Sequence, residues 1–133
     1  MADRLHSAAI HLLRRLRVQD EALGISAPRL SALSVLVFAG AMRIGALAHI
    51  EQVEPPTMTR LIDGMERDGY VGRRLDPKDR RAVVVQATTK GRRALMKGRA
   101  QRVAALAADI RALSPQELAA LAAGVEALEQ MLD

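Results

Sequence analysis

The chain has 133 residues, half of them apolar, which suits a single folded domain with one core. It contains no cysteine, so disulfides, thiolate zinc sites and cysteine-based redox sensing are excluded. The net charge of +5 suggests an anionic partner, and no apolar run approaches the ~20 residues of a membrane span. With no secretory signal at the start, we expect a cytoplasmic protein.

Four helices are predicted in the first half of the chain, because apolar side chains recur there at three- and four-residue spacing. Their expected bounds are about 3–22, 28–38, 44–52 and 55–68. Glycine follows three of these segments and marks their ends, and Ser26 is the expected N-cap of the second. The fourth helix can begin at Pro55 and Pro56, because proline is tolerated in a first turn.

A β-hairpin is predicted next. Residues 70–75 and 82–87 have strand character, since the second run is rich in β-branched side chains. The run Asp-Pro-Lys-Asp at residues 76–79 is a turn signal. The tip of the hairpin therefore carries three basic residues, Lys78, Arg80 and Arg81.

Two further helices end the chain. The first is expected from Thr88 or Thr89 to about Leu113, and the second starts at the capping box of Ser114 and Glu117. Like the first helix of the chain, both are rich in Leu and Ala and have little to pack against within one chain. We therefore expect the first helix and the last two helices to form a dimerisation region. The alternative is that these helices form the core of a monomer.

The expected fold class is mainly α with a small β-hairpin wing, namely a winged helix-turn-helix plus a helical dimerisation region. One domain covers residues 1–133. The DNA-reading part takes about residues 28–88, and the dimerisation helices take about 3–22 and 89–132.

Positive charge is concentrated between residues 73 and 102, where eleven basic residues stand against two acidic ones, while the rest of the chain is net negative. Such a segregated stripe is the electrostatic footprint of phosphate binding, although a solvated helix face is the plain alternative. Aromatic residues make up only 2% of the chain, so it lacks the stacking platforms that bind single strands. The basic stripe therefore indicates duplex DNA.

The exposed face of the fourth predicted helix is expected to enter the major groove. Arg60 can fork onto a guanine edge or clamp a phosphate. Thr57 and Thr59 can offer hydroxyls to phosphates or methyls to thymine, and ordinary capping and solvation is the alternative for both. The start of this helix adds partial positive charge toward phosphate.

The hairpin tip is the second expected contact with DNA. Arg81 or Arg80 would enter the minor groove while Lys78 meets a phosphate. Asp79 would pair with a neighbouring arginine and fix its direction. Together, the candidate DNA-binding residues are Pro56, Thr57, Thr59, Arg60, Arg73, Lys78, Asp79, Arg80 and Arg81.

Three runs at these spacings carry a family resemblance: Thr-Arg-Leu-Ile-Asp at 59–63, Glu-Arg-Asp-Gly-Tyr-Val at 66–71 and Asp-Pro-Lys-Asp-Arg-Arg at 76–81. With them, essentially the whole chain resembles the MarR family of bacterial transcription regulators. The resemblance implies that Thr59 and Arg60 belong to the recognition helix. It also implies that Asp79 and Arg81 form the Asp-x-Arg of the wing, with Arg81 in the minor groove.

Three positions depart from the pattern of that family. Arg43 stands near the place where a threonine or serine usually caps the third helix, and a missing cap costs about 1 kcal/mol. Glu54 brings a negative charge close to the start of the DNA-facing helix, which suits the helix dipole but opposes phosphate. Ala87 replaces the leucine usual before the capping threonine.

The resemblance further implies a homodimer that binds an inverted-repeat operator, represses nearby genes and releases DNA when a small aromatic or phenolic anion binds. His11, Arg14 and Arg15 are the candidate ligand-binding residues, with an ordinary helix-surface role as the alternative for each.

An enzyme is not expected. His6 and His11 are five residues apart, which splits them across a helix, so with His49 they do not make a metal triad. No Gly-rich phosphate loop or nucleophile elbow is present. We therefore expect no metal and no cofactor. The remaining alternative is a protein-interaction or architectural role for the winged helix.

Overall fold

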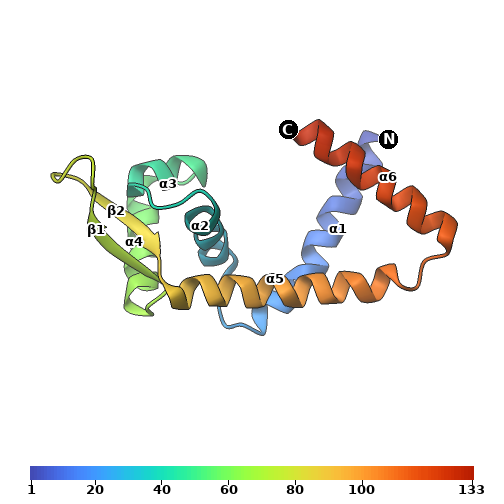
Figure 1. Cartoon of the computed structure of the whole chain (residues 1–133), viewed down its shortest axis with the longest axis horizontal. Coiled ribbons are helices and arrows are strands. Elements are labelled where there is room, and N and C mark those ends of the chain that lie inside the picture. The colour runs from blue at the N-terminus through green and yellow to red at the C-terminus, as the bar shows by residue number, and fades with distance from the viewer. The chain divides into compact units, whose positions relative to one another are not determined.

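The computed structural model describes residues 1–133 and contains six helices and one two-stranded antiparallel sheet (Figure 1). In chain order the elements are α1 (Ala2–Glu21), α2 (Ala27–Phe38), α3 (Ile44–Ile50), α4 (Pro55–Arg67), β1 (Val71–Leu75), β2 (Val83–Ala87), α5 (Thr89–Ile110) and α6 (Pro115–Leu132). The chain divides into two compact units, residues 1–99 and 100–133. The predicted fold class, mainly α with a β-hairpin wing, is confirmed.

The observed elements end a few residues from their predicted bounds in two places. Helix α3 stops at Ile50, and Gln52 has a φ of 55°, in the left-handed region that cannot continue a helix. Helix α5 stops at Ile110, and the residues after it form hydrogen-bonded turns before α6. Of the two threonines predicted to cap α5, Thr88 does so, since its Oγ1 accepts from the Gly91 N–H at 3.1 Å.

The core of the first unit lies between α2, α3, α4 and the hairpin. Its largest fully buried side chains are Leu33, Leu47, Met58, Ile62, Met65, Val71 and Val85. Burial of one such side chain contributes roughly 1.5–3 kcal/mol, and no polar or charged residue is buried with them. This apolar cluster therefore holds the helices and the hairpin together.

The hairpin is tied to the start of α3 by backbone hydrogen bonds. Strands β1 and β2 pair antiparallel, from Val71 opposite Ala87 to Leu75 opposite Val83. Met42, which lies outside the strands, exchanges two backbone hydrogen bonds of 3.1 and 2.8 Å with Val85 of β2. Arg43, the residue that follows Met42, is thus fixed beside the hairpin.

The start of α5 packs against the Tyr70 carbonyl, and only glycine at position 91 permits this approach. A Cβ on Gly91 would lie 2.1 Å from the Tyr70 oxygen, closer than any nonbonded contact allows. The Thr88 hydroxyl donates to the Gly69 carbonyl at 2.6 Å, beside its bond from the Gly91 N–H. These contacts set the direction in which α5 leaves the hairpin.

Helices α1 and α6 bury no residue within the chain. Each carries several exposed large apolar side chains: Leu5, Ile10, Leu12, Leu13 and Val18 on α1, and Leu118, Leu121, Val125, Met131 and Leu132 on α6. The predicted capping box of α6 is confirmed, with reciprocal bonds between Ser114 and Glu117. None of the helices combines the length and apolar character that crossing a membrane requires. The assignment of these helices to dimerisation stays a prediction.

We expect Gly91→Ala to destabilise the first unit, because its methyl group would overlap the Tyr70 carbonyl. Overpacking of this kind lowers the free energy of unfolding by about 1–3 kcal/mol, which urea unfolding followed by circular dichroism measures. Gly45→Ala in α3 is the control, since nothing lies within 4 Å of the added Cβ. It should be neutral or stabilise by about 0.5–1 kcal/mol. Wild-type stability for Gly91→Ala would contradict the close contact.

Candidate nucleic-acid interface

Helix α4 divides into a buried face and an exposed face. Met58, Ile62 and Met65 are at most 1% exposed and lie in the core. Pro55 and Pro56 occupy the first turn, where their missing N–H groups remove no helix bond. The predicted DNA-contacting residues of the helix are all exposed, namely Pro56, Thr57, Thr59 and Arg60.

Thr59 and Arg60 keep hydrogen-bonding capacity for a ligand. The Thr59 hydroxyl donates to the Pro55 carbonyl at 3.0 Å, so its oxygen still has acceptor sites. The Arg60 Nε lies 3.4 Å from the Pro56 carbonyl, and neither of its Nη groups has a partner in the chain. A guanidinium with free Nη groups can make paired bonds to a guanine edge or to a phosphate.

Arg29 of α2 holds the second half of α4. Its guanidinium crosses Gly64, where a Cβ would lie 2.6 Å from Nη2, and it pairs with the Asp68 carboxylate. This hydrogen bond from Arg29 holds the pKa of Asp68 below its usual range. Glycine at position 64 therefore leaves room for the Arg29 side chain of α2 to reach α4.

Arg73 of β1 connects the hairpin to α4 through two ion pairs. Its Nη2 lies 2.6 Å from Asp63 and its Nη1 lies 2.6 Å from Glu66, one helical turn further on. The hydrogen bond with Asp63 is the main cause of a raised pKa for the Arg73 guanidinium. The sequence predicts a DNA contact for Arg73, but its side chain is only 25% exposed and committed to two carboxylates. The geometry supports a role in positioning α4.

Two aspartates shape the wing loop, residues 76–82, between β1 and β2. Asp76 Oδ1 accepts from the Lys78 backbone N–H at 2.9 Å, and Asp79 Oδ1 accepts from the Arg81 backbone N–H at 3.1 Å. Bonds of this kind let Asp fold the backbone into a tight turn. The bond from the Lys78 N–H is the main reason that the pKa of Asp76 is lowered.

The arginine that pairs with Asp79 is not a neighbour in the wing, so the expected pairing is wrong in its partner. Nη2 of Arg43, at the start of α3, lies 3.3 Å from Asp79 Oδ2 and 3.4 Å from Asp76 Oδ2. Arg43 precedes Asp79 by 36 residues, and no spacing rule links residues so far apart. As predicted, no side chain caps α3.

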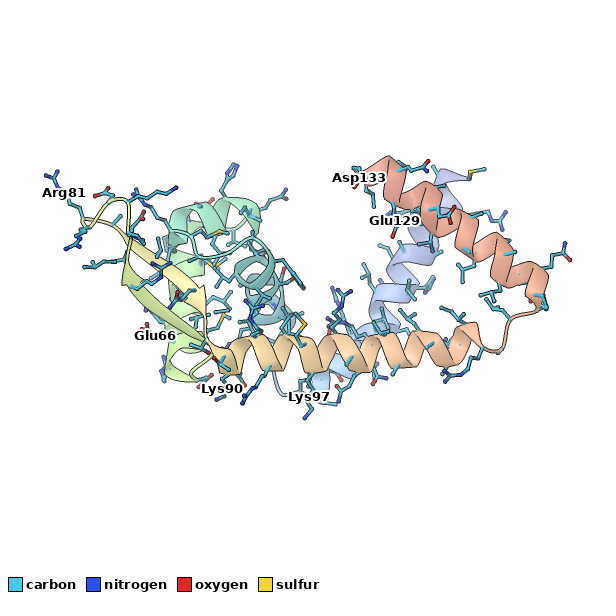
Figure 2. All side chains as sticks on the ribbon, in the orientation of Figure 1. Glu66, Arg81, Lys90, Lys97, Glu129 and Asp133 are labelled. Carbon is cyan, nitrogen blue, oxygen red and sulfur yellow. The ribbon has the colours of Figure 1, made fainter.

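The basic stripe falls into paired and unpaired cations. Arg73 and Arg74 are bonded to side chains, and Lys90 donates to the Asp68 carbonyl at 2.6 Å while lying 4.7 Å from the centre of the Tyr70 ring. The exposed side chains of three wing residues form no hydrogen bond or ion pair, namely Lys78, Arg80 and Arg81. Figure 2 shows Arg81 at the tip of the hairpin, extending away from the ribbon.

The predicted ligand-binding residues lie on α1. His11, Arg14 and Arg15 are exposed, and their three- and four-residue spacing places them on one side of the helix. Their contact with an effector stays a prediction.

Residues 25–83 match the model of the MarR family. HTH-type transcriptional regulator Mb0904 of Mycobacterium bovis is 39% identical over 113 residues, covering 80% of this chain and 79% of the relative. A MarR family protein of Bacillus stearothermophilus has a similar structure, with a TM-score of 0.84, 27% identity and coverage of 98% of this chain and 91% of that chain. A mutant of S. aureus MepR, solved bound to an oligodeoxyribonucleotide, shares the fold with a TM-score of 0.75, 19% identity and coverage of 100% and 99%. The family match and the 39% identical relative indicate a regulator of transcription.

Because Arg29 pairs with Asp68, the free energy of unfolding should depend on pH in the acid range. Because the pKa of Asp68 is lowered in the folded protein, its contribution is present above the ordinary value of 3.8 and is lost as the pH falls through the folded-state pKa. The free energy of unfolding of Asp68→Asn should therefore fall less steeply than that of the wild type between about pH 5 and pH 2. Urea unfolding at a series of pH values measures this slope. Arg29→Met should flatten it in the same way, and unchanged slopes in both variants would contradict the pairing.

Proposed function

The chain belongs to the MarR family of DNA-binding transcription regulators, and we propose that it is a repressor that occupies an inverted-repeat operator as a homodimer. The observation that carries this proposal is the pairing of two exposed surfaces in one folded unit. One is the polar face of α4 with the uncommitted Nη groups of Arg60, and the other is the wing loop with its three unpaired cations.

The exposed face of α4 suits the major groove of duplex DNA. The first turn of the helix adds partial positive charge, which favours phosphate at that end. Arg60 offers two Nη groups to a guanine edge, and Thr57 and Thr59 offer hydroxyl and methyl groups. Arg73 would act indirectly, because its bonds to Asp63 and Glu66 hold the angle at which α4 meets the groove.

The wing loop suits the minor groove. Narrow A·T-rich minor grooves have an enhanced negative potential that attracts arginine. Arg81 stands at the tip of the hairpin (Figure 2) with no ion pair in the chain. We assign Arg81 to the minor groove, Arg80 as its alternative, and Lys78 to phosphate, with Asp79 shaping the loop from behind.

The apolar surfaces of α1 and α6 support a homodimer. Leu13 on α1 is 60% exposed and Leu121 on α6 is 41% exposed, and both belong to the runs of apolar side chains described above. Exposed apolar surface of this extent marks an interaction site. A dimer with twofold symmetry presents two recognition helices, which explains why an inverted repeat would be read.

Repression and its relief follow from occupancy of the operator. A dimer that covers a promoter blocks transcription, and it does so only while both helices fit half-sites about one DNA turn apart. A small aromatic or phenolic anion held by His11, Arg14 and Arg15 of α1 would release DNA by changing the spacing or freedom of the two helices. A regulator of this kind acts on the chromosome, so we place the protein in the cytoplasm.

Selection of bound sequences from random duplex DNA, repeated with candidate phenolic anions, tests this function. We expect enrichment of an inverted repeat, with affinity that falls steeply with salt. Equal affinity for a scrambled duplex would indicate an architectural protein instead. Absence of any duplex binding would leave a protein partner as the function of the winged helix.

Substitution of Arg60 should reduce sequence preference, whereas substitution of Lys78 should reduce affinity for any duplex. Arg60→Ala should weaken binding to the selected site by about 1–3 kcal/mol and relax the preference at one base pair. Lys78→Ala should weaken all duplexes alike and reduce the slope of log affinity against log salt by about 1. Titrations of selected and scrambled duplexes at several salt concentrations measure both effects. Wild-type binding by both variants would refute the contact assignment.

Charge placed on the apolar surface of α1 or α6 should dissociate the dimer. Leu13→Glu and Leu121→Glu should each sediment at the monomer mass at micromolar concentration, because a buried unpaired carboxylate is costly. Leu75→Glu is the matched control, since Leu75 is 58% exposed on the hairpin and lies outside these helices. A dimer that survives both helix substitutions would show that another surface joins the chains.

A further inference from the structure

Arg43 occupies a position that the local structure does not explain. It is the N-cap residue of α3, where its extended backbone precedes the helix and its side chain makes no capping bond. Ser, Thr, Asn and Asp are the residues that satisfy a helix start, and a cation there opposes the helix dipole. The Arg43 side chain therefore serves something other than α3.

The contacts of Arg43 lie in the wing loop. The neighbouring Met42 is paired with Val85 through two backbone hydrogen bonds, which fixes Arg43 beside the hairpin. From there one nitrogen, Nη2, lies 3.4 Å from Asp76 Oδ2 and 3.3 Å from Asp79 Oδ2. One guanidinium thus faces both aspartates of the loop.

The two carboxylate oxygens of each aspartate have different partners. Its Oδ1 accepts a backbone N–H and folds the loop, and its Oδ2 faces Arg43. The carboxylates would repel each other without a cation between them. They are also the nearest acids in sequence to Arg80 and Arg81, whose side chains remain unpaired.

We propose that Arg43 is the positioning residue of the minor-groove contact: through Asp76 and Asp79 it clamps the wing loop to α3 and keeps these acids from capturing Arg80 and Arg81. The inference rests on the proposed function, because it assigns a role in the DNA contact to a residue outside the wing. In the clamped loop, Arg81 is both held in place and left free for DNA. When Arg43 is lost, Asp79 becomes available to the arginines beside it.

A double-mutant cycle on the full chain tests the clamp against a direct contact of Arg43 with phosphate. Arg43→Thr supplies an ordinary cap for α3 and removes the guanidinium. We expect it to lower affinity for the selected operator about tenfold, and Arg81→Ala should then cost much less than in the wild type. If Arg43 contacts phosphate on its own, the losses from the two substitutions will multiply, which overturns the proposal.

Substitution of Asp76 or Asp79 separates the clamp from simple electrostatics, because the two predict opposite changes in affinity for DNA. Asp79→Asn retains an oxygen for the Arg81 N–H but removes the charge that faces Arg43. Simple electrostatics predicts tighter DNA binding when a surface loses negative charge. The clamp predicts weaker binding, by a smaller factor than for Arg43→Thr because the substituted side chain has no charge with which to capture an arginine, and Asp76→Asn should change affinity in the same direction. Tighter binding in both Asn variants overturns the proposal.

The clamp can also be measured without DNA. Amide hydrogen exchange and backbone ¹⁵N relaxation should show greater mobility of residues 76–82 in Arg43→Thr, including the Arg81 N–H, while melting of the fold is unchanged. An equally ordered loop in the variant overturns the clamp. If the wild type prefers no duplex sequence, the proposed function fails, whereas loop mobility in the free protein still decides whether Arg43 holds the wing.

Discussion

The apolar side of α4 has to be buried, and the other contact surfaces of the winged helix depend on this requirement. Met58, Ile62 and Met65 carry the burial, at most 1% exposed, and the helical period then turns Thr59 and Arg60 outward. Burial fixes which face is exposed but leaves the helix free to tilt. Ion pairs from two sides, Arg29 to Asp68 and Arg73 to Asp63 and Glu66, restrict that tilt.

Some cations of the basic stripe pair with carboxylates of the chain and others stay unpaired, and the sequence alone does not distinguish the two groups. Arg73 of the stripe faces two carboxylates of α4, and Arg43, which lies outside the stripe, faces two carboxylates of the wing loop. One arginine thus serves each pair of carboxylates, Arg73 for Asp63 and Glu66 and Arg43 for Asp76 and Asp79. Three of the cations without a bonded partner, Lys78, Arg80 and Arg81, lie in the wing loop, where a phosphate would be met. Net charge alone would have counted all of them as phosphate contacts.

Periodicity, glycine and proline placed the elements to within a few residues, because helix starts, stops and turns are local events. The exposed face of α4 was equally predictable, since it follows from spacing alone. Contacts between distant segments were not. Arg43 lies 36 residues from Asp79, and Arg29 lies 39 residues from Asp68 across a glycine whose purpose appears only in three dimensions. The ion pairs of Arg73 could not be predicted for the same reason, because a cation in a basic stripe shows no partner until the chain is folded.

The core that positions α4 is complete within residues of one chain, whereas α1 and α6 bury nothing within it. Association through these helices would therefore add little to the internal structure of the winged helix and would mainly set the separation of two copies. Affinity for an inverted repeat depends steeply on that separation, since both helices must fit one operator at once. A ligand on α1 could then end DNA binding without unfolding the DNA-reading part. The wing is different, because its order depends on Arg43 within the same chain, so wing contact and half-site spacing are physically separate controls on binding.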